Sequence, residues 1–362
     1  MKKSTLLQLA PALDPKLGGP ISVIQSTDFL DEIFEVDRIF IGSFFEFHKE
    51  FISIRAILNN TLGVPGLGSY KNLINHIAKC DIVLSHGFYM WTSLLAIIFG
   101  NGKIFVMPHG SLEEYQWGRS RVKKKLFDKL FFYFAAKKYF LFLVATRSEE
   151  ESVLKKFPNA KTRVVGLGIN PPELFRVRRV AKNKTIKLIT LSRITHKKRI
   201  DRAIESLDFL PKNSNKYHLR VSGTGDINLL SKLKSTAARL TSTNEVEFTG
   251  WISQNQIETF IDDADIFLLP SENENFAVAV AQSIARGLPV IVSEEVALAH
   301  FVRQYECGVV LKDISPNSIS QAIVEVTQNI EFFSQNCIMH GPLLYWGSVK
   351  NNWFRALEGD SL

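Results

Sequence analysis

Short apolar runs alternate with longer stretches of helical periodicity from one end of the chain to the other. Runs of about four to eight apolar residues suit buried strands, and their alternation with helices is typical of βαβ units and parallel sheets. We therefore expect two doubly wound, Rossmann-like α/β domains. In the first half the predicted strands are TLLQLA, VDRIFI, DIVLSH, KIFVMPHG, FLFLVAT and TRVVGLG. In the second half they are IKLITLS, YHLRVSGTG, EVEFTG, DIFLLPS and LPVIVS.

The length of 362 residues also favours two domains, because single hydrophobic cores usually stop growing near ~250 residues. The stretch INPPELFRVRRVAKNKT predicts a linker near residues 171–184. We place an N-terminal domain at 1–172 and a C-terminal domain at 173–342, with a final helix over 343–360 that packs back on the first domain. The two domains are expected to face each other across a cleft at the carboxyl ends of both sheets, where doubly wound folds bind ligands.

Charge and cysteine content narrow the expected partners and compartment. The formal net charge of +8 is compatible with a polyanionic partner such as a phosphate, a nucleic acid or an acidic membrane. Nucleic acid is disfavoured because no binding module is recognisable. The three cysteines show no ligand spacing, so we expect neither a disulfide framework nor a metal site. MKKSTLLQLAPAL lacks a signal-peptide cleavage site and no long stretch is uncharged, so we expect a cytoplasmic protein.

Two glycines follow a predicted strand in VSGTGDINLL. Gly223 and Gly225 would let a ligand phosphate or base approach the backbone, and a plain tight turn is the alternative explanation. A dinucleotide fingerprint needs a third glycine at the position of Asn228, so an NAD-dependent dehydrogenase is disfavoured.

A basic loop follows the first strand of the second half, in LSRITHKKRID. Arg193 comes directly after the strand, and Lys197 and Lys198 stand just before a predicted helix. A guanidinium and an ammonium that converge at the carboxyl end of a strand can clamp a diphosphate. An ordinary solvated basic loop is the alternative.

The stretch PSENENFAVAVAQSIARGLPVIVS predicts a strand end, a helix and a buried strand. We expect the helix to open at Glu274, where its positive end stabilises a carboxylate by ~0.3–1 kcal/mol; simple capping is therefore one explanation. The other is a sugar site, because the backbone N–H groups of Asn275 and Phe276 and the carboxylate would bind hydroxyl groups together. Gln282 would lie on the same side of this helix.

The same stretch resembles the donor-binding signature of retaining glycosyltransferases of family 4, which have the GT-B fold. That signature is an acid, a seven-residue gap, a second acid and then A-x-G-x-P-V-I. Further matches occur in the right order over roughly residues 5–312. They are GGP, MPHGSLEEYQW, ATRSEEESVL, VGLGIN, LSRITHKKRID, VSGTGD, FTGWIS and ADIFLLPS.

The resemblance assigns catalytic roles to four residues. It places His109 beside the transferred sugar, Arg193 and Lys198 on the diphosphate in place of a metal, and Glu274 on the sugar hydroxyls. The other residues that it implies for donor binding are Gly18, Gly19, Gly223, Gly225, Asn275, Phe276, Ala277 and Gln282.

The chain departs from the family pattern at several of these positions. The second acid is Gln282, which would meet the ribose and, lacking a charge, would weaken donor binding roughly tenfold. Ala277 and Arg199 stand where the family commonly has glycine, and Leu167 stands where it has asparagine. We expect Ala277 to be helical, so that no positive φ is needed there.

The resemblance implies a hexosyltransferase that moves a sugar from a nucleotide-diphosphate donor to a saccharide or lipid-linked acceptor, with retention and without a metal or other cofactor. Bacterial surface polysaccharide is the expected destination. A catalytically silent GT-B protein that binds a nucleotide or a partner is a second hypothesis, and a nucleotide-sugar epimerase with a related fold is a third.

Two further features leave alternatives open. Residues 119–142 hold eight Lys or Arg, one acid and eight aromatics. They predict either peripheral contact with an anionic membrane or an ordinary helix with Phe127, Phe131 and Phe134 packed inward, followed by a buried strand. His86 ends a predicted strand, where it would make either a structural hydrogen bond or a catalytic contact.

Overall fold

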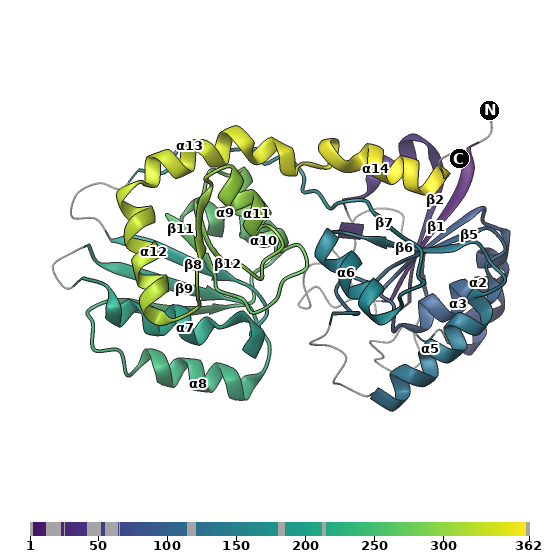
Figure 1. The fold of residues 1–362 in the computed structure, drawn as a ribbon, viewed down its shortest axis with the longest axis horizontal. Helices are drawn as coiled ribbons and strands as arrows, with labels where there is room; N and C mark the ends of the chain where they lie inside the picture. The colour runs from purple at the N-terminus through teal and green to yellow at the C-terminus, as the bar shows by residue number, and fades with distance from the viewer. Residues whose placement is uncertain are drawn as a thin grey trace. The chain divides into compact units, whose positions relative to one another are not determined.

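The computed structural model describes residues 3–11, 23–24, 26–41, 52–54, 64, 66–113, 121–179, 185–211 and 215–359. They form two compact units, which are described separately (Figure 1). The chain passes from the first unit to the second between Leu167 and Gly168 and returns between Ser348 and Val349. The boundaries expected from the sequence are 172/173 and 342/343.

The first unit is built on a parallel sheet whose described strands follow the order β3-β2-β1-β4-β5-β6-β7. Connections run outward from β1 and β4 in opposite directions, which makes the sheet doubly wound. The strands are β1 (Ser4–Pro11), β2 (Phe34–Ile41), β3 (Ile52–Ile54), β4 (Ile82–His86), β5 (Lys103–Met107), β6 (Phe140–Val144) and β7 (Thr162–Val164).

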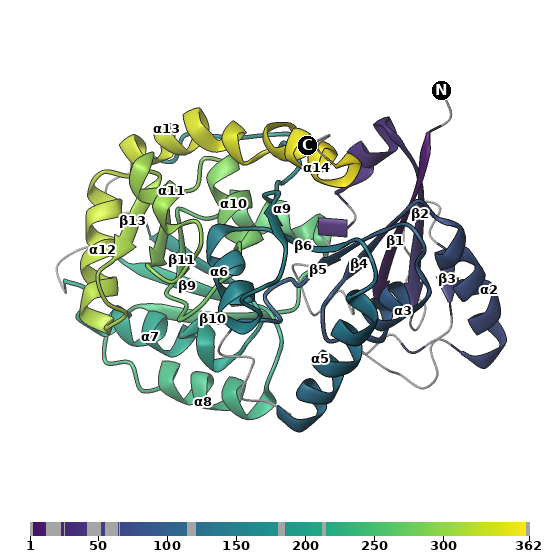
Figure 2. The ribbon, with the colours of Figure 1, turned by 45° about the vertical axis from the view of Figure 1, so that its right-hand side comes forward.

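Helices cover this sheet and bury its apolar strands. They are η2 (Asp28–Glu32), α2 (Leu67–Lys79), α3 (Trp91–Phe99), α5 (Arg121–Ala135), α6 (Arg147–Lys156) and α14 (Trp346–Glu358). Helices α2, α3 and α5 lie side by side (Figure 2) and share one core with the strands. In α14 the indole of Trp353 is fully buried and donates to the carbonyl of Gly166. The polar end of this large apolar side chain is thereby satisfied.

The second unit has the same kind of parallel sheet, with the strand order β10-β9-β8-β11-β12-β13 in the described residues. Its strands are β8 (Ile186–Leu191), β9 (Tyr217–Ser222), β10 (Glu245–Gly250), β11 (Ile266–Leu269), β12 (Val290–Ser293) and β13 (Gly308–Leu311). Strand order reverses between β8 and β11, and ligands of doubly wound sheets bind outside the carboxyl ends of the strands at such a point.

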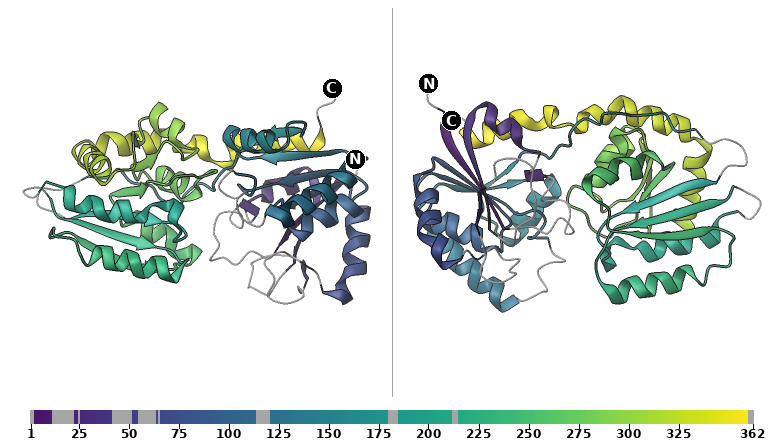
Figure 3. Two further views of the ribbon diagram at one scale, coloured as in Figure 1. Left: turned by 60° about the horizontal axis from the view of Figure 1, so that its bottom comes forward. Right: turned by 180° about the vertical axis from the view of Figure 1, so that it is seen from behind.

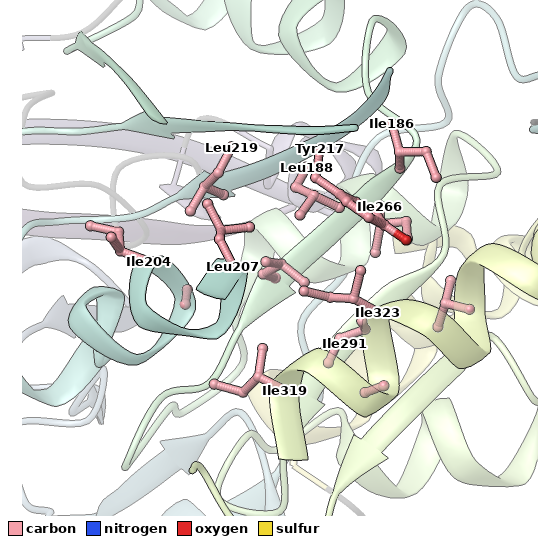
Figure 4. Close-up of a cluster of buried hydrophobic side chains, with 14 of the residues drawn as sticks. Ile186, Leu188, Ile204, Leu207, Tyr217, Leu219, Ile266, Ile291, Ile319 and Ile323 are labelled. Carbon is pink, nitrogen blue, oxygen red and sulfur yellow. The ribbon is translucent and has the colours of Figure 1, made fainter. Parts of the chain in front are cut away.

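The helices of the second unit lie on both faces of its sheet. They are η3 (His196–Lys198), α7 (Ile200–Glu205), η4 (Ser206–Phe209), α8 (Ile227–Ala237), α9 (Gln254–Asp262), α10 (Val278–Ala285), α11 (Ala299–Gln304), α12 (Pro316–Gln328), α13 (Ile330–His340) and η5 (Gly341–Leu344). Helices α7 and α8 are neighbours (Figure 3). The buried side chains of α7, η4 and α12 meet those of the strands in one core, to which Ile204, Leu207 and Ile323 belong (Figure 4).

Local sequence explains where several of these helices begin. The Thr146 hydroxyl accepts from the N–H of Glu149 at the start of α6, and Asp226 accepts from two N–H groups at the start of α8. Ser315 caps α12 just before Pro316. Each cap satisfies backbone donors that a helix leaves unpaired at its first turn.

The expected fold class is confirmed, and all eleven predicted strands are present. Two strands were missed. They are β3, with three residues, and β13, with four. No helix in the described part of the chain is both long and apolar enough to cross a bilayer.

Candidate functional site

The loops after β8 and β11 bring the basic segment and the acidic segment of the sequence together. The two strands are parallel neighbours, with Ile266 opposite Leu188, so their carboxyl ends lie at the same edge of the sheet. The loop after β8 carries Arg193 and Lys198, and the loop after β11 carries Glu274. The polar groups therefore gather at the switch point of the second sheet.

Lys198 and Glu274 form a buried ion pair. The Lys198 ammonium donates to Oε1 of Glu274, and both side chains are nearly buried, at 9% and 11% exposed. The Ser271 hydroxyl donates to the same oxygen at 3.1 Å. Lys197 is also buried and its ammonium lies 3.4 Å from Oδ1 of Asn273. We call these five residues the lysine–glutamate cluster.

The backbone around Glu274 is fixed by a short bridge to the loop after β12. The N–H of Glu274 donates to the carbonyl of Glu295 at 3.0 Å, and its carbonyl accepts from the N–H of Ala297 at 3.2 Å. Helix α10 begins only at Val278. The expectation that Glu274 opens the helix is therefore wrong. Glu274 and Gln282 were also expected to lie on one continuous helix, and Glu274 lies outside α10.

The charges of the cluster favour an ionised carboxylate. Burial is the largest influence on the pKa of Glu274 and would raise it, but Lys198, Lys197 and the hydrogen bonds outweigh burial and hold the pKa below its ordinary value. The pKa of Lys198 is lowered, chiefly by burial, with Lys197 and Arg193 acting in the same direction and Glu274 opposing them. Arg193 thus lies within electrostatic range of Lys198.

Two departures from the family pattern sit at left-handed backbone positions. Ala277 has φ +62° and Arg199 has φ +48°. The expectation of a helical Ala277 without positive φ is wrong, because Ala277 is the residue that precedes the first turn of α10. Glycine adopts this conformation freely, whereas a residue with a Cβ is strained by ~1–2 kcal/mol. The ion pairs of Arg199 with Asp201 and Glu272 help to hold it there.

Gly223 and Gly225 are required by the neighbouring loop of the protein. A Cβ on Gly223 would lie 1.8 Å from the carbonyl oxygen of Ser192, and one on Gly225 would lie 2.1 Å from that of Ile194. The side chain of Asp226 occupies the first N–H groups of α8. The glycines therefore support the loop that carries Arg193, and the tight turn explains them without a ligand.

The remaining second-unit candidates lie close to the cluster in sequence. Arg193 is exposed and makes no ion pair with the described residues. Phe276 is buried, while Asn275 and Gln282 are half-buried. Gln282 is the fifth residue of α10.

The first unit holds its candidate site at the carboxyl ends of β4 and β5. His86 Nδ1 and His109 Nε2 are 2.9 Å apart, and the two rings are nearly parallel at 16°. Burial lowers the pKa of His109 to about 4 and lowers the pKa of His86 well below 6.5. Both imidazoles are therefore neutral at pH 7. The contact of His86 with His109 comes from the pairing of β4 with β5, and the sequence alone does not show it.

Two candidates, Gly18 and Gly19, lie outside the described residues. Within the described part of the chain, no group of three or more His, Cys, Asp or Glu side chains could hold a metal ion. The three cysteines are buried and free.

Comparison with known proteins gives the class of the second unit. Residues 171–333 match the family described as Glycosyl transferases group 1. The matched part of the chain carries Arg193, Lys198 and Glu274. The two units together have the two-domain α/β GT-B fold seen in the similar solved structures.

Individual proteins similar to the chain include the amylovoran biosynthesis glycosyltransferase AmsK of Erwinia amylovora. It is 27% identical over 177 residues, which are 47% of this chain and 43% of AmsK. The chain spans about half of the length of the first three curated relatives that it matches, or less. Sucrose-phosphate synthase from Thermosynechococcus elongatus has a TM-score of 0.77 at 16% identity, with 99% of this chain and 100% of that chain covered. Anabaena Alr3699/HepE in complex with UDP-glucose has a TM-score of 0.74 at 12% identity, with 97% and 99% covered.

The buried ion pair should behave as one energetic unit. We expect Lys198→Met to lower the free energy of unfolding by about 3 kcal/mol, because it leaves a buried carboxylate with too few partners. Glu274→Gln should also destabilise. The double variant should recover about 1–3 kcal/mol relative to the sum of the two single changes. Urea unfolding of the four proteins measures this coupling, and additive effects would contradict the pairing.

Relief of the left-handed strain should stabilise the protein. We expect Ala277→Gly to raise the free energy of unfolding by about 0.5–1 kcal/mol, the strain removed less the entropy that glycine adds to the unfolded chain. Ala279→Gly, two residues along in α10, is the matched control and should lose about 1 kcal/mol. Thermal and urea unfolding provide the measurement. Equal losses in both variants would show that position 277 carries no such strain.

Proposed function

We propose that the protein is a retaining, metal-independent hexosyltransferase of family 4. It would transfer the sugar of a nucleotide-diphosphate donor to a saccharide or lipid-linked saccharide acceptor in the synthesis of a bacterial surface polysaccharide, such as O-antigen, capsule or exopolysaccharide. The observation that carries this proposal is the lysine–glutamate cluster at the switch point of the group 1 domain, with Arg193 within electrostatic range of it. The named activity of AmsK supports the polysaccharide destination.

The cluster offers complementary groups for the two ends of a sugar nucleotide. An ammonium has three N–H donors. Lys198 can therefore keep its bond to Glu274 and still donate to a diphosphate oxygen, which the exposed guanidinium of Arg193 would also bind. The Glu274 carboxylate, held ionised, accepts hydrogen bonds from sugar hydroxyls. The ion pair thus links the sugar-binding acid to the phosphate-binding base.

The proposed reaction breaks the bond between the anomeric carbon and the diphosphate oxygen while the acceptor oxygen bonds to the same face of that carbon. Arg193 and Lys198 stabilise the negative charge that develops on the leaving diphosphate, which takes up the proton of the acceptor hydroxyl. Preorganised cations of this kind are usually the largest single contribution to such a rate. His109 would contact the same sugar, as the family resemblance implies, and Gln282 would bond the ribose through its amide.

The donor remains to be identified by experiment. Anabaena HepE is similar in fold and was solved with UDP-glucose, so UDP-hexoses are the first donors to test, followed by GDP-hexoses. A bound donor at 100 times its Kd should stabilise the protein by ~2.7 kcal/mol, which a thermal-shift screen detects.

We further propose that α5 contacts an anionic membrane at the cytoplasmic face. Its inner face packs Phe131 into the core, as expected for an ordinary helix. Its outer face nevertheless exposes an apolar stripe at intervals of four, four and three residues, which places the members on one side of the helix. The stripe consists of Val122, Leu126, Leu130 and Tyr133. The exposed lysines beside it are Lys123, Lys125 and Lys129.

The first test of the proposed function is donor turnover. We expect the protein to release nucleoside diphosphate slowly from one donor of the panel, and to form a product whose anomeric configuration, seen by NMR, is that of the donor. Arg193→Gln should lower kcat/KM about 100-fold because it removes charge from the leaving group. Arg239 is exposed and lies two residues beyond the end of α8, so Arg239→Gln is the control and should leave kcat/KM unchanged.

If no donor of the panel releases nucleoside diphosphate while the protein still binds nucleotide, the result would instead favour the catalytically silent GT-B protein. A product with the opposite anomeric configuration would refute the retaining mechanism, but the protein would still be a transferase.

The membrane contact predicts charge-dependent binding to vesicles. We expect the protein to co-sediment with phosphatidylglycerol vesicles and not with phosphatidylcholine vesicles. Lys125→Glu combined with Lys129→Glu should weaken binding at least roughly 30-fold, because each basic residue contributes about 1 kcal/mol near an anionic surface. Lys71→Glu combined with Lys79→Glu on α2 makes the same change in net charge and should have less effect. Equal loss in both pairs would indicate a general charge effect rather than docking by α5.

A further inference from the structure

The histidine pair of the first unit is a well-formed hydrogen bond between two neutral rings. Strand β4 ends at His86 and β5 ends two residues before His109, and the two strands are in register with His86 opposite Met107. The 2.9 Å separation of His86 Nδ1 and His109 Nε2 goes with ring centroids 5.2 Å apart and nearly parallel planes. The rings therefore meet at their edges, so that one N–H can point at the lone pair of the other nitrogen. His86 is almost completely buried, at 1% exposed.

The surroundings of His86 decide which ring donates. A neutral imidazole carries one proton, so one of the two facing nitrogens is a donor and the other an acceptor. Nε2 of His86 is buried and has no hydrogen-bond partner among the described residues. If His109 donated, His86 would hold its proton on this Nε2, as a buried unpaired N–H. If His86 donates from Nδ1, only a lone pair is left unpaired. Orphaned buried N–H groups are the rarer case in proteins.

The assignment of His86 as the donor holds at neutral pH, because neither ring is protonated to the imidazolium. Burial lowers the pKa of His86 well below 6.5 and that of His109 to about 4, and the nearby His109 adds to the effect on His86. Each ring therefore holds a single proton at neutral pH. With the His86 proton on Nδ1, the His109 proton must be on Nδ1 as well.

The backbone of His109 is held separately, by Glu149. His109 has φ +51° and is followed by Gly110 with φ +75°, and positive φ is uncommon for residues other than glycine. The buried Glu149 carboxylate accepts from the N–H of Gly110 and from the N–H of Ala145, each at 2.7 Å. This carboxylate joins the loop after β5 to the loop after β6. Strain of this kind persists where the surroundings hold it, and it gathers at functional sites.

We propose that His86 is a positioning residue that sets the tautomer of His109, so that a neutral His109 offers an Nδ1–H donor to its ligand, while Glu149 holds the turn on which His109 stands. The ligand in question is the donor sugar, and this part of the inference rests on the proposed function. A neutral N–H donor suits an uncharged hydroxyl or ring oxygen of a sugar, whereas an imidazolium would compete with the cationic sites for the diphosphate.

The tautomer can be observed without any ligand. Long-range ¹H–¹⁵N correlation spectra of the ¹⁵N-histidine-labelled full chain at pH 7 distinguish a protonated from an unprotonated ring nitrogen. The chain has eight histidines, and the loss of one set of signals in His109→Gln assigns His109. We expect Nδ1 of His109 to be protonated and Nε2 to be bare. A protonated Nε2 in the wild-type protein overturns the inference, whatever the activity.

Two variants test the part played by His86. His86→Leu has a similar size and no donor, and we expect His109 to move to the Nε2–H tautomer that free histidine favours. His86→Asn retains an N–H donor close to the position of Nδ1 and should keep the wild-type tautomer. A merely structural role would not produce this difference. If both variants, or neither, change the tautomer, His86 does not set it.

Measurements of donor turnover distinguish a failure of this inference from a failure of the proposed function. With the active donor, His86→Leu should lower kcat/KM roughly tenfold, as for the loss of one hydrogen bond, and His86→Asn should restore most of it. If no donor is turned over but the tautomer is as expected, the proposed function fails and the assignment of His86 stands. Full activity of a His86→Leu variant whose tautomer has changed would overturn the link to catalysis.

Discussion

A buried lysine that meets a buried glutamate constrains the whole carboxyl edge of the second sheet. Removing either charge from water is costly unless the partner and further hydrogen bonds are in place. Here the Ser271 hydroxyl bonds both Glu274 and the carbonyl of Lys197, and the N–H of Glu272 donates to the same carbonyl at 2.7 Å. The loops after β8 and β11 are thus tied together. The acid is therefore held both by the loop that carries the base and by the backbone bridge to the loop after β12.

Backbone strain marks the same regions. Four non-glycine residues in the described chain have positive φ, namely His109, Arg199, Ala277 and Glu306. Three of them adjoin candidate functional side chains. At Arg199 and Ala277 the family commonly has glycine, so this chain keeps the backbone shape while giving up the residue that adopts it most easily. Strain of this kind persists only where the surrounding contacts hold it.

Sequence periodicity was sufficient for the fold and for the grouping of the basic and acidic loops. Parallel strands place their carboxyl ends at one edge, so strand order alone brings Arg193, Lys198 and Glu274 to the same side. The start of α10 could not be predicted, because the run from Glu274 to Gln282 has good helical composition and the break at Ala277 is a left-handed alanine. That conformation is imposed by the bridge between Glu274 and the loop after β12, a contact between segments some twenty residues apart.

The histidine pair was missed for a different reason. His86 and His109 lie far apart in sequence and share no spacing, and only the register of β4 with β5 makes them neighbours. Nothing in the composition near Glu149 suggests that its carboxylate reaches the turn of His109 as well as its own helix start. Contacts of this kind depend on atoms at hydrogen-bond distance, which a pattern of apolar and polar residues does not encode.

Each unit thus uses two neighbouring strand ends to bring a polar pair together, and the two pairs differ in charge. The second unit has an ionic pair with a further arginine near it, which suits a substrate group with two negative charges. The first unit has a neutral pair, because burial lowers the pKa of both rings. A sugar nucleotide has the same division of character, with a charged diphosphate and an uncharged polyhydroxyl ring. The division follows from burial and from which side chains each sheet edge supplies.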